Sequence, residues 1–214
     1  MAPHVKLTYF NGRQRGEVIR WILSYGGQEF TDNRIDFGEW FKDREASKAK
    51  TPLGNVPYIE VDGKRLGQSH AIGRYLARQN GCAGQNPWEE AEVDAIVDFT
   101  EDVYQKFLNW LRAELIFKDP KADEIKKQFV SVDAVPYLKK FEELVQGNQN
   151  GQAFIAGSGP TWADFTVVAF LDEVIEMVEP TILDSYPALS SYVARVHNLK
   201  GIKQWLAKRP VTQY

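Results

Sequence analysis

The sequence contains little that could support cysteine or metal chemistry. Its single cysteine, Cys82, excludes an internal disulfide framework and a C-x-x-C redox pair. The three histidines, His4, His70 and His197, lie too far apart in the sequence to show the ligand spacing of a metal site. We therefore expect a function that needs no bound metal and no redox-active pair of thiols.

Long apolar runs and a strong excess of one charge are also absent. No stretch of about 18 apolar residues occurs, and the start, MAPHVKLTYF, lacks the charged-then-apolar layout of a signal peptide. A net charge of -3 gives no basic surface suited to nucleic acid. Hydrophobic residues, at 43%, are sufficient for a globular core. We expect a soluble cytoplasmic protein that binds neither membranes nor nucleic acid.

What the chain does contain is one stretch, Thr51–Ile72, with several distinct signals. Val56 and Pro57 lead into an apolar run, Tyr58–Val61, which reads as a strand. A proline at the start of a strand cannot donate to a ladder, and X-Pro bonds are the common site of a cis peptide. A cis bond would turn the backbone of Val56 outward, where its N–H and C=O could pair with an extended peptide.

The second half of this stretch predicts a hairpin followed by a helix. Asp62-Gly63 is typical of a two-residue turn, Lys64–Leu66 is the return strand, and Gly67 ends it. Ser69 is a good N-cap for the helix that follows, and a helix N-terminus suits a carboxylate. The stretch is thus either a peptide-binding edge with a carboxylate cradle or a plain hairpin followed by a helix.

The N-terminal residues around this stretch predict an α/β layer that ends near Asn80. Val5–Tyr9 alternates as a strand, and a helix with apolar positions from Val18 to Tyr25 follows. A weaker strand over 30–35 would pair in parallel with the first one through a right-handed crossover. A short polar helix is expected over 38–50. Residues 81–87 are rich in glycine and asparagine and form the expected linker.

The rest of the chain, residues 88–214, predicts an all-α domain. Thr161 and Asp164 form a variant capping box before a strongly apolar helix, which marks that helix as buried. Residues 147–151 are expected to be a loop. Other helices are expected over 88–117, over 123–145 with an interruption at Pro136, over 188–197 and over 202–206.

The N-V-P motif, the hairpin and Gln-Ser-His-Ala-Ile together resemble the glutathione-binding half of cytosolic glutathione transferases. The resemblance covers nearly the whole chain and implies a thioredoxin-like domain over 1–80 and an all-α domain over 88–214. It is greatest for the sigma class, which includes invertebrate detoxification enzymes and glutathione-dependent prostaglandin D synthase. The segments that carry it are Leu7–Asn11, Gly12–Arg20, Trp40, Gln68-Ser69 and Val93–Asp98.

The resemblance implies roles for residues that would hold glutathione. The backbone of Val56, after which Pro57 is cis, would pair with the cysteinyl unit, and Gln68 and Ser69 would hold the γ-glutamyl carboxylate. The indole N–H of Trp40 would meet the glycyl carboxylate; the alternative is a tryptophan that packs on a helix surface. A cation would accompany it, either Arg44 or Lys42, since the lysine usual in the family is not at the matching position.

The chemistry implied is the ionisation of the glutathione thiol. Lowering a thiol pKa of about 8.5 by two units takes roughly 2.7 kcal/mol, and one hydrogen bond to a charged group supplies about 1.5–3 kcal/mol. By resemblance Tyr9, at the end of the first strand, donates to the sulfur, and Arg15 supports the thiolate electrostatically. The alternatives are a tyrosine of the core and a solvated arginine.

The all-α domain would contribute the remaining contacts. By resemblance Asp102 crosses a homodimer interface to the γ-glutamyl ammonium, although acidic residues on an exposed helix are usually only solvated. Leu53 stands where some classes place an aromatic interface residue, which predicts a fairly polar interface. The electrophile would lie between the domains, against residues that could equally be packing: Phe10, Gly12, Gln14, Tyr104 and Trp110.

Four functions compete on this fold. The leading hypothesis is conjugation of the glutathione thiolate to apolar electrophiles. A related one is isomerisation of prostaglandin H2 to prostaglandin D2. The third is a carrier of haem or other apolar ligands, and the fourth is a structural descendant with vestigial activity. Retention of Tyr9, Val56-Pro57 and Gln68-Ser69 argues against the fourth and does not separate the first three.

Overall fold

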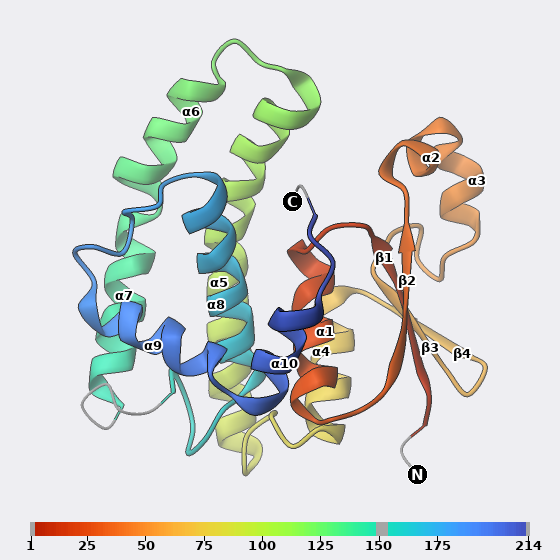
Figure 1. Ribbon diagram of the computed structural model, residues 1–214, viewed down its shortest axis with the longest axis horizontal. Helices are drawn as coiled ribbons and strands as arrows, with labels where there is room; N and C mark the ends of the chain where they lie inside the picture. Colours follow the sequence, from red (N-terminus) through yellow and green to blue (C-terminus); the bar gives the residue numbers. More distant parts are fainter. Residues whose placement is uncertain (1–2, 149–153, 213–214) are drawn as a thin grey trace. The chain divides into compact units, whose positions relative to one another are not determined.

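The computed structural model describes residues 3–148 and 154–212, and a four-stranded sheet carries its N-terminal part (Figure 1). The sheet order is β2-β1-β3-β4. β1 (Val5–Phe10) runs parallel to β2 (Phe30–Ile35), as expected, and antiparallel to β3 (Tyr58–Val61). The side chains of Val5 and Leu7 are fully buried beneath the sheet, so β1 is central in both position and packing.

The hairpin expected at Asp62-Gly63 is confirmed. β3 and β4 (Lys64–Gly67) pair antiparallel, with Val61 opposite Lys64. Asp62 and Gly63 have φ values of 49° and 76°, as a tight hairpin turn of the type favoured by Asp-Gly requires. Gly67 is the last residue of the strand, where a break was expected.

Three helices pack together in this part of the chain. α1 (Gln14–Tyr25) and α4 (Ser69–Gln79) lie against the sheet, and α10 (Lys200–Lys208) packs on α1 (Figure 1). Gly201 of α10 approaches the backbone of Ser24 so closely that a Cβ atom would stand 2.1 Å from the Ser24 carbonyl oxygen. This contact fixes the C-terminal segment on the N-terminal domain.

The single helix expected over 38–50 is two helices. α2 (Phe37–Lys42) and α3 (Arg44–Ala49) are separated at Asp43, whose ψ of 77° is not helical. Asp36 and Asp43 each cap the helix that follows them by accepting a backbone N–H, from Glu39 at 2.8 Å and from Ala46 at 3.1 Å. The second cap explains the break, because Asp43 favours starting a new helix over continuing the old one.

The middle of the chain is helical throughout its described elements. The long helix expected over 88–117 is α5, which ends in a π-helical turn, η1. The stretch expected over 123–145 is divided by a second π-helical turn, η2, and Pro136 lies in the first turn of the next helix, where a missing N–H costs nothing. The bounds are α5 (Pro87–Arg112), η1 (Ala113–Phe117), α6 (Ala122–Gln128), η2 (Phe129–Asp133), α7 (Val135–Gly147), α8 (Trp162–Met177) and α9 (Pro187–His197).

The capping box expected before the apolar helix is confirmed at the start of α8. The Asp164 carboxylate accepts the backbone N–H of Thr161 at 2.7 Å and its hydroxyl at 3.0 Å. α8 is buried along most of its length and packs on α5, as its hydrophobicity on most sides predicts. Of the loop expected over 147–151, Gly147 ends α7, and residues 149–151 lie outside the described residues.

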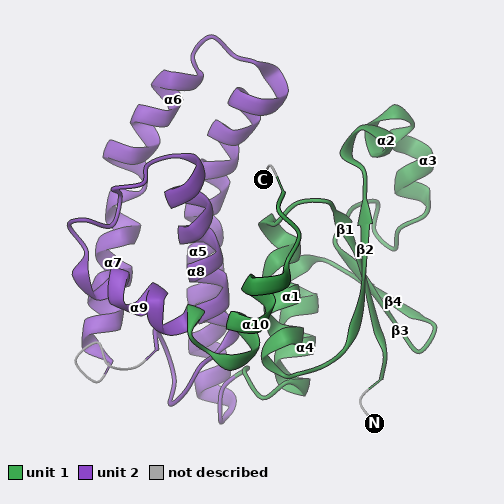
Figure 2. Ribbon diagram, in the orientation of Figure 1, with its two compact units in different colours: residues 1–83, 197–214 green, residues 84–196 purple. Residues whose placement is uncertain are grey.

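The chain divides into two units that Figure 2 distinguishes by colour. Unit 1 is Met1–Ala83 together with His197–Tyr214, and unit 2 is Gly84–Val196. The architecture is an α/β thioredoxin-like domain followed by a helical domain. The described residues 197–212, expected in the all-α domain, instead belong to unit 1, where α10 packs on α1.

None of the described helices is both long and apolar enough to cross a membrane.

Candidate active site

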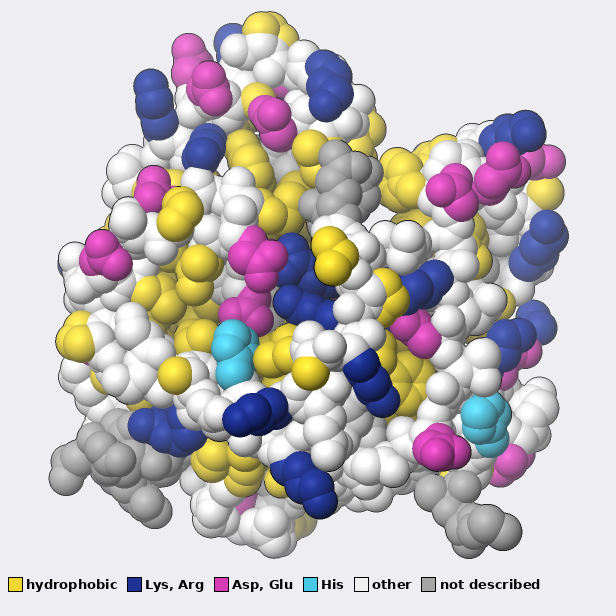
Figure 3. Space-filling model, in the orientation of Figure 1, with side chains coloured by type: hydrophobic (Ala, Val, Ile, Leu, Met, Phe, Trp, Pro, Cys, Tyr) yellow, Lys and Arg dark blue, Asp and Glu magenta, His cyan; other side chains and the backbone are white. Residues whose placement is uncertain are grey.

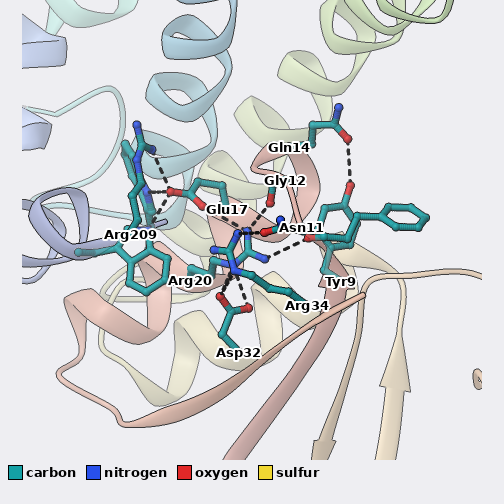
Figure 4. A network of polar contacts seen from close by, with 12 residues as sticks. Tyr9, Asn11, Gly12, Gln14, Glu17, Arg20, Asp32, Arg34 and Arg209 are labelled. Carbon is teal, nitrogen blue, oxygen red and sulfur yellow. Dashed lines mark hydrogen bonds and ion pairs between the residues drawn. The ribbon is translucent and has the colours of Figure 1, made fainter. Parts of the chain in front are cut away.

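Tyr9 lies near the carboxyl end of β1, where its ring is buried and only 4% of the side chain is exposed. Its hydroxyl donates to Oε1 of Gln14 at 3.3 Å (Figure 4). That distance is long for an O–H···O bond, which is usually about 2.7–2.8 Å. A stronger acceptor that enters the site can therefore compete with Gln14 for the proton of Tyr9.

The position of the Tyr9 ring depends on a glycine in the first turn of α1. A Cβ atom on Gly16 would lie 2.4 Å from Cδ1 and 2.8 Å from Cγ of the Tyr9 ring. No real Cβ atom tolerates such a contact, so the ring can pack against α1 only because residue 16 has no side chain.

We predict that Gly16→Ala lowers activity by displacing Tyr9. Alanine favours a helix by about 1 kcal/mol over glycine, so the substitution would be stabilising if helix propensity decided the outcome. Gly147→Ala in α7 is the matched control, because a Cβ atom there meets nothing within 4 Å. Steady-state turnover and unfolding midpoints of both variants measure the effect. A Gly16→Ala protein as active as the control would show that the ring needs no close approach.

The peptide bond between Val56 and Pro57 is cis, as expected from the sequence. Val56 immediately precedes the segment that enters β3, and its side chain is partly exposed. Within residues 3–148 and 154–212, neither the N–H nor the C=O of Val56 has a hydrogen-bond partner. The Val56 N–H can therefore donate to a carbonyl of a bound peptide, and the Val56 C=O can accept an N–H from it.

The start of α4 differs from the expectation in one respect. The N-cap is Gln68, and Ser69, expected to be the cap, is the first helical residue. Gln68 has φ 72° and ψ 113°, a conformation that a side chain rarely adopts, and its carbonyl accepts the N–H of Ile72 at 2.9 Å. Such strain is typical of ligand-binding positions. Gln68 is exposed to solvent.

Arg15 lies beside this helix start. Its Nη1 donates to the hydroxyl of Ser69 at 3.3 Å. The first turn of α4, the Ser69 hydroxyl and the Arg15 guanidinium therefore offer positive charge and donors at one place, which suits a carboxylate. The geometry brings Arg15 together with Ser69, whereas the role expected for Arg15 by resemblance is electrostatic support of the thiolate.

α2 carries an aromatic cluster that reaches back to the strand of Tyr9. Phe10 contacts Phe37 at 5.1 Å and Trp40 at 5.7 Å between ring centroids, the second pair edge to face. Phe37 contacts Phe41 at 4.6 Å. Hydrophobic side chains are visible at this end of unit 1 beside charged ones (Figure 3). Trp40 is thus packed against Phe10 while part of its surface stays exposed.

The two candidate cations beside Trp40 have different surroundings. Lys42 is well exposed and its ammonium lies 3.7 Å from a carboxylate oxygen of Glu39. The Arg44 guanidinium stands over the Phe41 ring, 5.7 Å from its centroid. Stacking orients Arg44 toward the aromatic cluster that includes Trp40, whereas Lys42 is directed along its own helix.

The candidate residues of unit 2 lie on α5. Asp102 is exposed, and its neighbour Glu101 accepts a hydrogen bond from Gln105. Tyr104 and Trp110 are buried, and both rings contact Phe107, at 5.7 and 5.8 Å. Packing within the helical core accounts for these two contacts. Among the described residues no group of three or more His, Cys, Asp or Glu side chains could hold a metal ion.

Comparison with known proteins decides the family. Residues 5–78 match the model of the glutathione S-transferase N-terminal domain, and residues 93–209 match that of the C-terminal domain. The chain belongs to the glutathione S-transferase family. Glutathione S-transferase 1 of Ascaris suum is 38% identical over 216 residues, which cover 99% of this chain and 100% of that protein.

Solved structures of glutathione transferases agree with the fold. A monomeric glutathione S-transferase of the hookworm Necator americanus has a TM-score of 0.89 at 32% identity, over 99% of this chain and 100% of that one. A prostaglandin synthase D of Nilaparvata lugens has a TM-score of 0.86 at 34% identity, over 98% of this chain and 100% of that one. Members of this transferase family use glutathione as co-substrate.

Sequence reasoning missed two charged residues next to this glutathione transferase site. Glu17 and Arg20 are buried on α1, although the helical pattern drew attention only to its apolar positions. Two opposite charges three residues apart, on an otherwise apolar helix face, were the pattern that could have indicated this buried pair. Opposite charges at that spacing pair on a helix surface, and a pair on the core-facing side needs further partners to be stable.

Proposed function

We propose that this protein conjugates the thiolate of glutathione to apolar electrophiles, as a cytoplasmic detoxification enzyme of the sigma class. The observation that carries the proposal is the buried Tyr9 hydroxyl near the end of β1, which donates to Gln14 at 3.3 Å. A buried hydroxyl donor that is held in position is suited to stabilise a thiolate. The cost of ionising the thiol at neutral pH, roughly 2.7 kcal/mol, is within what one such bond and one nearby cation supply.

The contacts proposed for glutathione are those that the resemblance implies, and the geometry of unit 1 supports them. The backbone of Val56, beside Pro57, pairs with the cysteinyl unit as an added strand would. The γ-glutamyl carboxylate binds at the start of α4, to Gln68, Ser69 and the Arg15 guanidinium that already reaches Ser69. At the other end of the peptide, Trp40 binds the glycyl carboxylate with a cation. Arg44 suits that role better than Lys42, which is paired with Glu39.

The reaction proposed has two steps. The thiol proton leaves to solvent as Tyr9 donates to the sulfur, and Arg15 favours the negative charge. The sulfur then bonds to the electrophilic carbon, and the leaving group departs with the electron pair of the broken bond. On unit 1, apolar surface for the electrophile is proposed by position at Phe10, Gly12 and Gln14.

Turnover against a small panel tests this function. Purified protein is mixed with glutathione and an aryl halide, and conjugate formation is followed by absorbance. The bound thiol is titrated separately, through the ultraviolet absorbance of the thiolate in the binary complex. A thiol that titrates as it does in free solution, with no conjugation of any panel member, would contradict the proposal.

A second candidate is the isomerisation of prostaglandin H2 to prostaglandin D2, in which the thiolate opens the endoperoxide. The likeness to the Nilaparvata lugens prostaglandin synthase D favours it. Including prostaglandin H2 in the panel compares the two reactions on one protein sample. An absorbance scan with haem tests the third possibility, a carrier of apolar ligands. Haem binding without turnover of any electrophile would favour the carrier.

We further propose that the protein is a homodimer in which Asp102 reaches the γ-glutamyl ammonium bound by the partner subunit. Asp102 is exposed, and so is Leu53, which stands at the interface position by resemblance. Two-fold symmetry makes such a contact reciprocal, so both sites gain or lose it together. The Necator americanus relative is described as monomeric, so dimerisation needs its own measurement.

We predict that Asp102→Asn raises the Michaelis constant for glutathione by up to about fivefold, because exposed ion pairs contribute ~0–1 kcal/mol. Folding stability should change little. Asp123→Asn on α6, another exposed carboxylate of unit 2, is the matched control and should leave the Michaelis constant unaltered. Sedimentation at the assay concentration accompanies the kinetics. A monomer with wild-type affinity for glutathione would rule out the shared site.

A further inference from the structure

A buried ion pair lies directly behind the candidate active site. Glu17 is 2% exposed and Arg20 is 0% exposed, both on α1, and Nη1 of Arg20 stands 3.3 Å from Oε2 of Glu17. Neither residue is among those proposed to touch glutathione. Buried charges are costly unless each is fully paired and hydrogen-bonded, so their other partners show what the pair holds in place.

Arg20 holds the loop that joins β1 to α1. Its Nη1 donates to the carbonyl oxygen of Gly12 at 2.7 Å, and Nη2 lies 3.5 Å from that of Phe10 (Figure 4). These two carbonyls belong to the turn between Tyr9 and Gln14, the two residues that share the weak hydroxyl contact. A fixed guanidinium behind the turn therefore determines where Gln14 stands relative to Tyr9.

The same turn is held from the neighbouring strand. Nε of Arg20 lies 3.1 Å from both carboxylate oxygens of Asp32 on β2. Asp32 also accepts Nε of Arg34 at 2.7 Å, and Nη1 of Arg34 donates to the side chain of Asn11 at 3.2 Å. Arg20 and Arg34, which share the Asp32 carboxylate, thus hold the turn: Arg20 contacts the carbonyls on either side of Asn11, and Arg34 contacts the Asn11 side chain.

Glu17 connects this assembly to the C-terminal segment. Its Oε1 accepts the indole N–H of Trp205 at 2.8 Å, Nη1 of Arg209 at 3.0 Å, and the indole N–H of Trp21 at 3.1 Å. Trp205 belongs to α10, and Arg209 follows it directly. Burial raises the pKa of Glu17, but Arg20, Trp205 and Arg209 together hold the pKa below its ordinary value. The carboxylate is therefore charged at neutral pH.

We propose that Arg209 and Trp205, acting through the buried Glu17–Arg20 pair, position the Tyr9–Gln14 turn and so set the acidity of the bound glutathione thiol. The proposal rests on the function proposed above. These are positioning residues, because none of them reaches the sulfur. Small displacements of a catalytic donor are costly, and a site holds its geometry only when the groups behind it are locked. Trp205 and Arg209 are far in sequence from the turn and from α1, so they can be substituted without changing either of them.

Arg209→Met tests the proposal by removing the hydrogen bond from Arg209 to Glu17. Lys208→Met is the matched control: the same charge is removed one residue earlier, from an exposed side chain. Three quantities are measured for each variant: the unfolding midpoint, the dissociation constant for glutathione, and the pKa of the bound thiol from thiolate absorbance. Turnover with an aryl halide is measured from mildly acidic to alkaline pH.

We expect Arg209→Met to raise the thiol pKa by about half a unit to one unit, which lowers the thiolate fraction roughly three- to tenfold in acidic solution, at pH values below the thiol pKa. Turnover should fall in proportion and recover in alkaline solution, while the dissociation constant changes less than about twofold, because the peptide contacts are untouched. Arg209→Lys should restore much of the acidity, since an ammonium can still donate to Glu17. Lys208→Met should match the wild type.

A purely structural role would give a different pattern. Arg209→Met would then lower the unfolding midpoint and leave the thiol pKa and the pH profile unchanged, which would overturn the inference while leaving the proposed function intact. Glu17→Gln provides a second variant that removes the charge in the middle of the connection, and an unchanged thiol pKa in a folded Glu17→Gln protein would also overturn it. If the wild type shows no bound thiolate, the proposed function fails and this inference fails with it.

Discussion

Replacing Tyr9 by phenylalanine is expected to lower turnover roughly 10- to 150-fold near neutral pH. That range is the rate equivalent of one hydrogen bond to a charged group, about 1.5–3 kcal/mol. The hydroxyl is the only part of Tyr9 that the substitution removes, and its hydrogen bond to Gln14, at 3.3 Å, is long. The ring should keep its place against Gly16. The loss should therefore come from the thiolate and not from the fold.

The pH dependence distinguishes this role from a binding role. Without the donor the bound thiol becomes less acidic, so the rate profile should shift toward alkaline pH, while the Michaelis constant for glutathione changes little. Tyr58→Phe on β3 is the matched control, because it removes a tyrosine hydroxyl from the next strand of the same sheet. A Tyr9→Phe protein with wild-type turnover in mildly acidic solution would remove Tyr9 from the mechanism.

Much of unit 1 could be predicted because its signals are local. The Asp62-Gly63 turn, the strand that starts after Pro57 and the alternation of β1 each depend on residues adjacent in the chain. The same is true of the capping box at Thr161 in unit 2. Turn and cap chemistry of this kind is decided within a few residues, so the sequence alone is enough to place it.

The errors concern competition between neighbours and contacts between distant segments. The expected N-cap of α4 is Ser69, whereas the observed one is Gln68. The positive φ of Gln68 is a conformation that residue preferences do not predict. Asp43 started a new helix where one had been expected to continue. Trp205 and Arg209 contact α1 at Glu17, a carboxylate nearly the whole chain away. No local pattern encodes a contact of that range.

Asp164 carries the largest stability effect that we expect. Its side chain is fully buried, and its two oxygens accept four hydrogen bonds. Oδ1 accepts the N–H of Ile155 and the hydroxyl of Tyr192, both at 2.8 Å. Oδ2 accepts the N–H and the hydroxyl of Thr161. The carboxylate thus joins the start of α8 to the segment at Ile155 and to α9, which is more than a cap alone would do.

Asparagine cannot replace this group in either orientation of its amide. Each oxygen of Asp164 faces one backbone N–H, so the NH2 group of asparagine must point at either Ile155 or Thr161 and leave that donor unpaired. A buried donor without an acceptor costs about 1–3 kcal/mol. Asp164→Ala leaves both backbone N–H groups without an acceptor, so its loss of unfolding free energy should be roughly twice as large. Both changes should lower the free energy of unfolding without altering the affinity for glutathione.

The loss should also depend on pH. Burial raises the pKa of Asp164 to about 6, from 3.8, although its four hydrogen bonds oppose the rise. Because the folded pKa is the higher one, the contribution of this group is complete below about pH 4 and declines by roughly 3 kcal/mol as the pH rises through 6. Asparagine has no such titration. The deficit of Asp164→Asn relative to wild type should therefore be larger at about pH 4.5 than at about pH 7.

Denaturant unfolding at those two pH values measures the difference. Comparing wild type with variant at each pH removes the contribution of the other carboxylates, including Glu17, whose lowered pKa acts in the opposite direction. Asp184→Asn is the control, since it makes the same chemical change at an exposed position of unit 2. A deficit that is greater at neutral than at acidic pH would mean that the four donors outweigh burial and keep Asp164 ionised. An unchanged midpoint at both pH values would show that the carboxylate holds neither α8 nor α9.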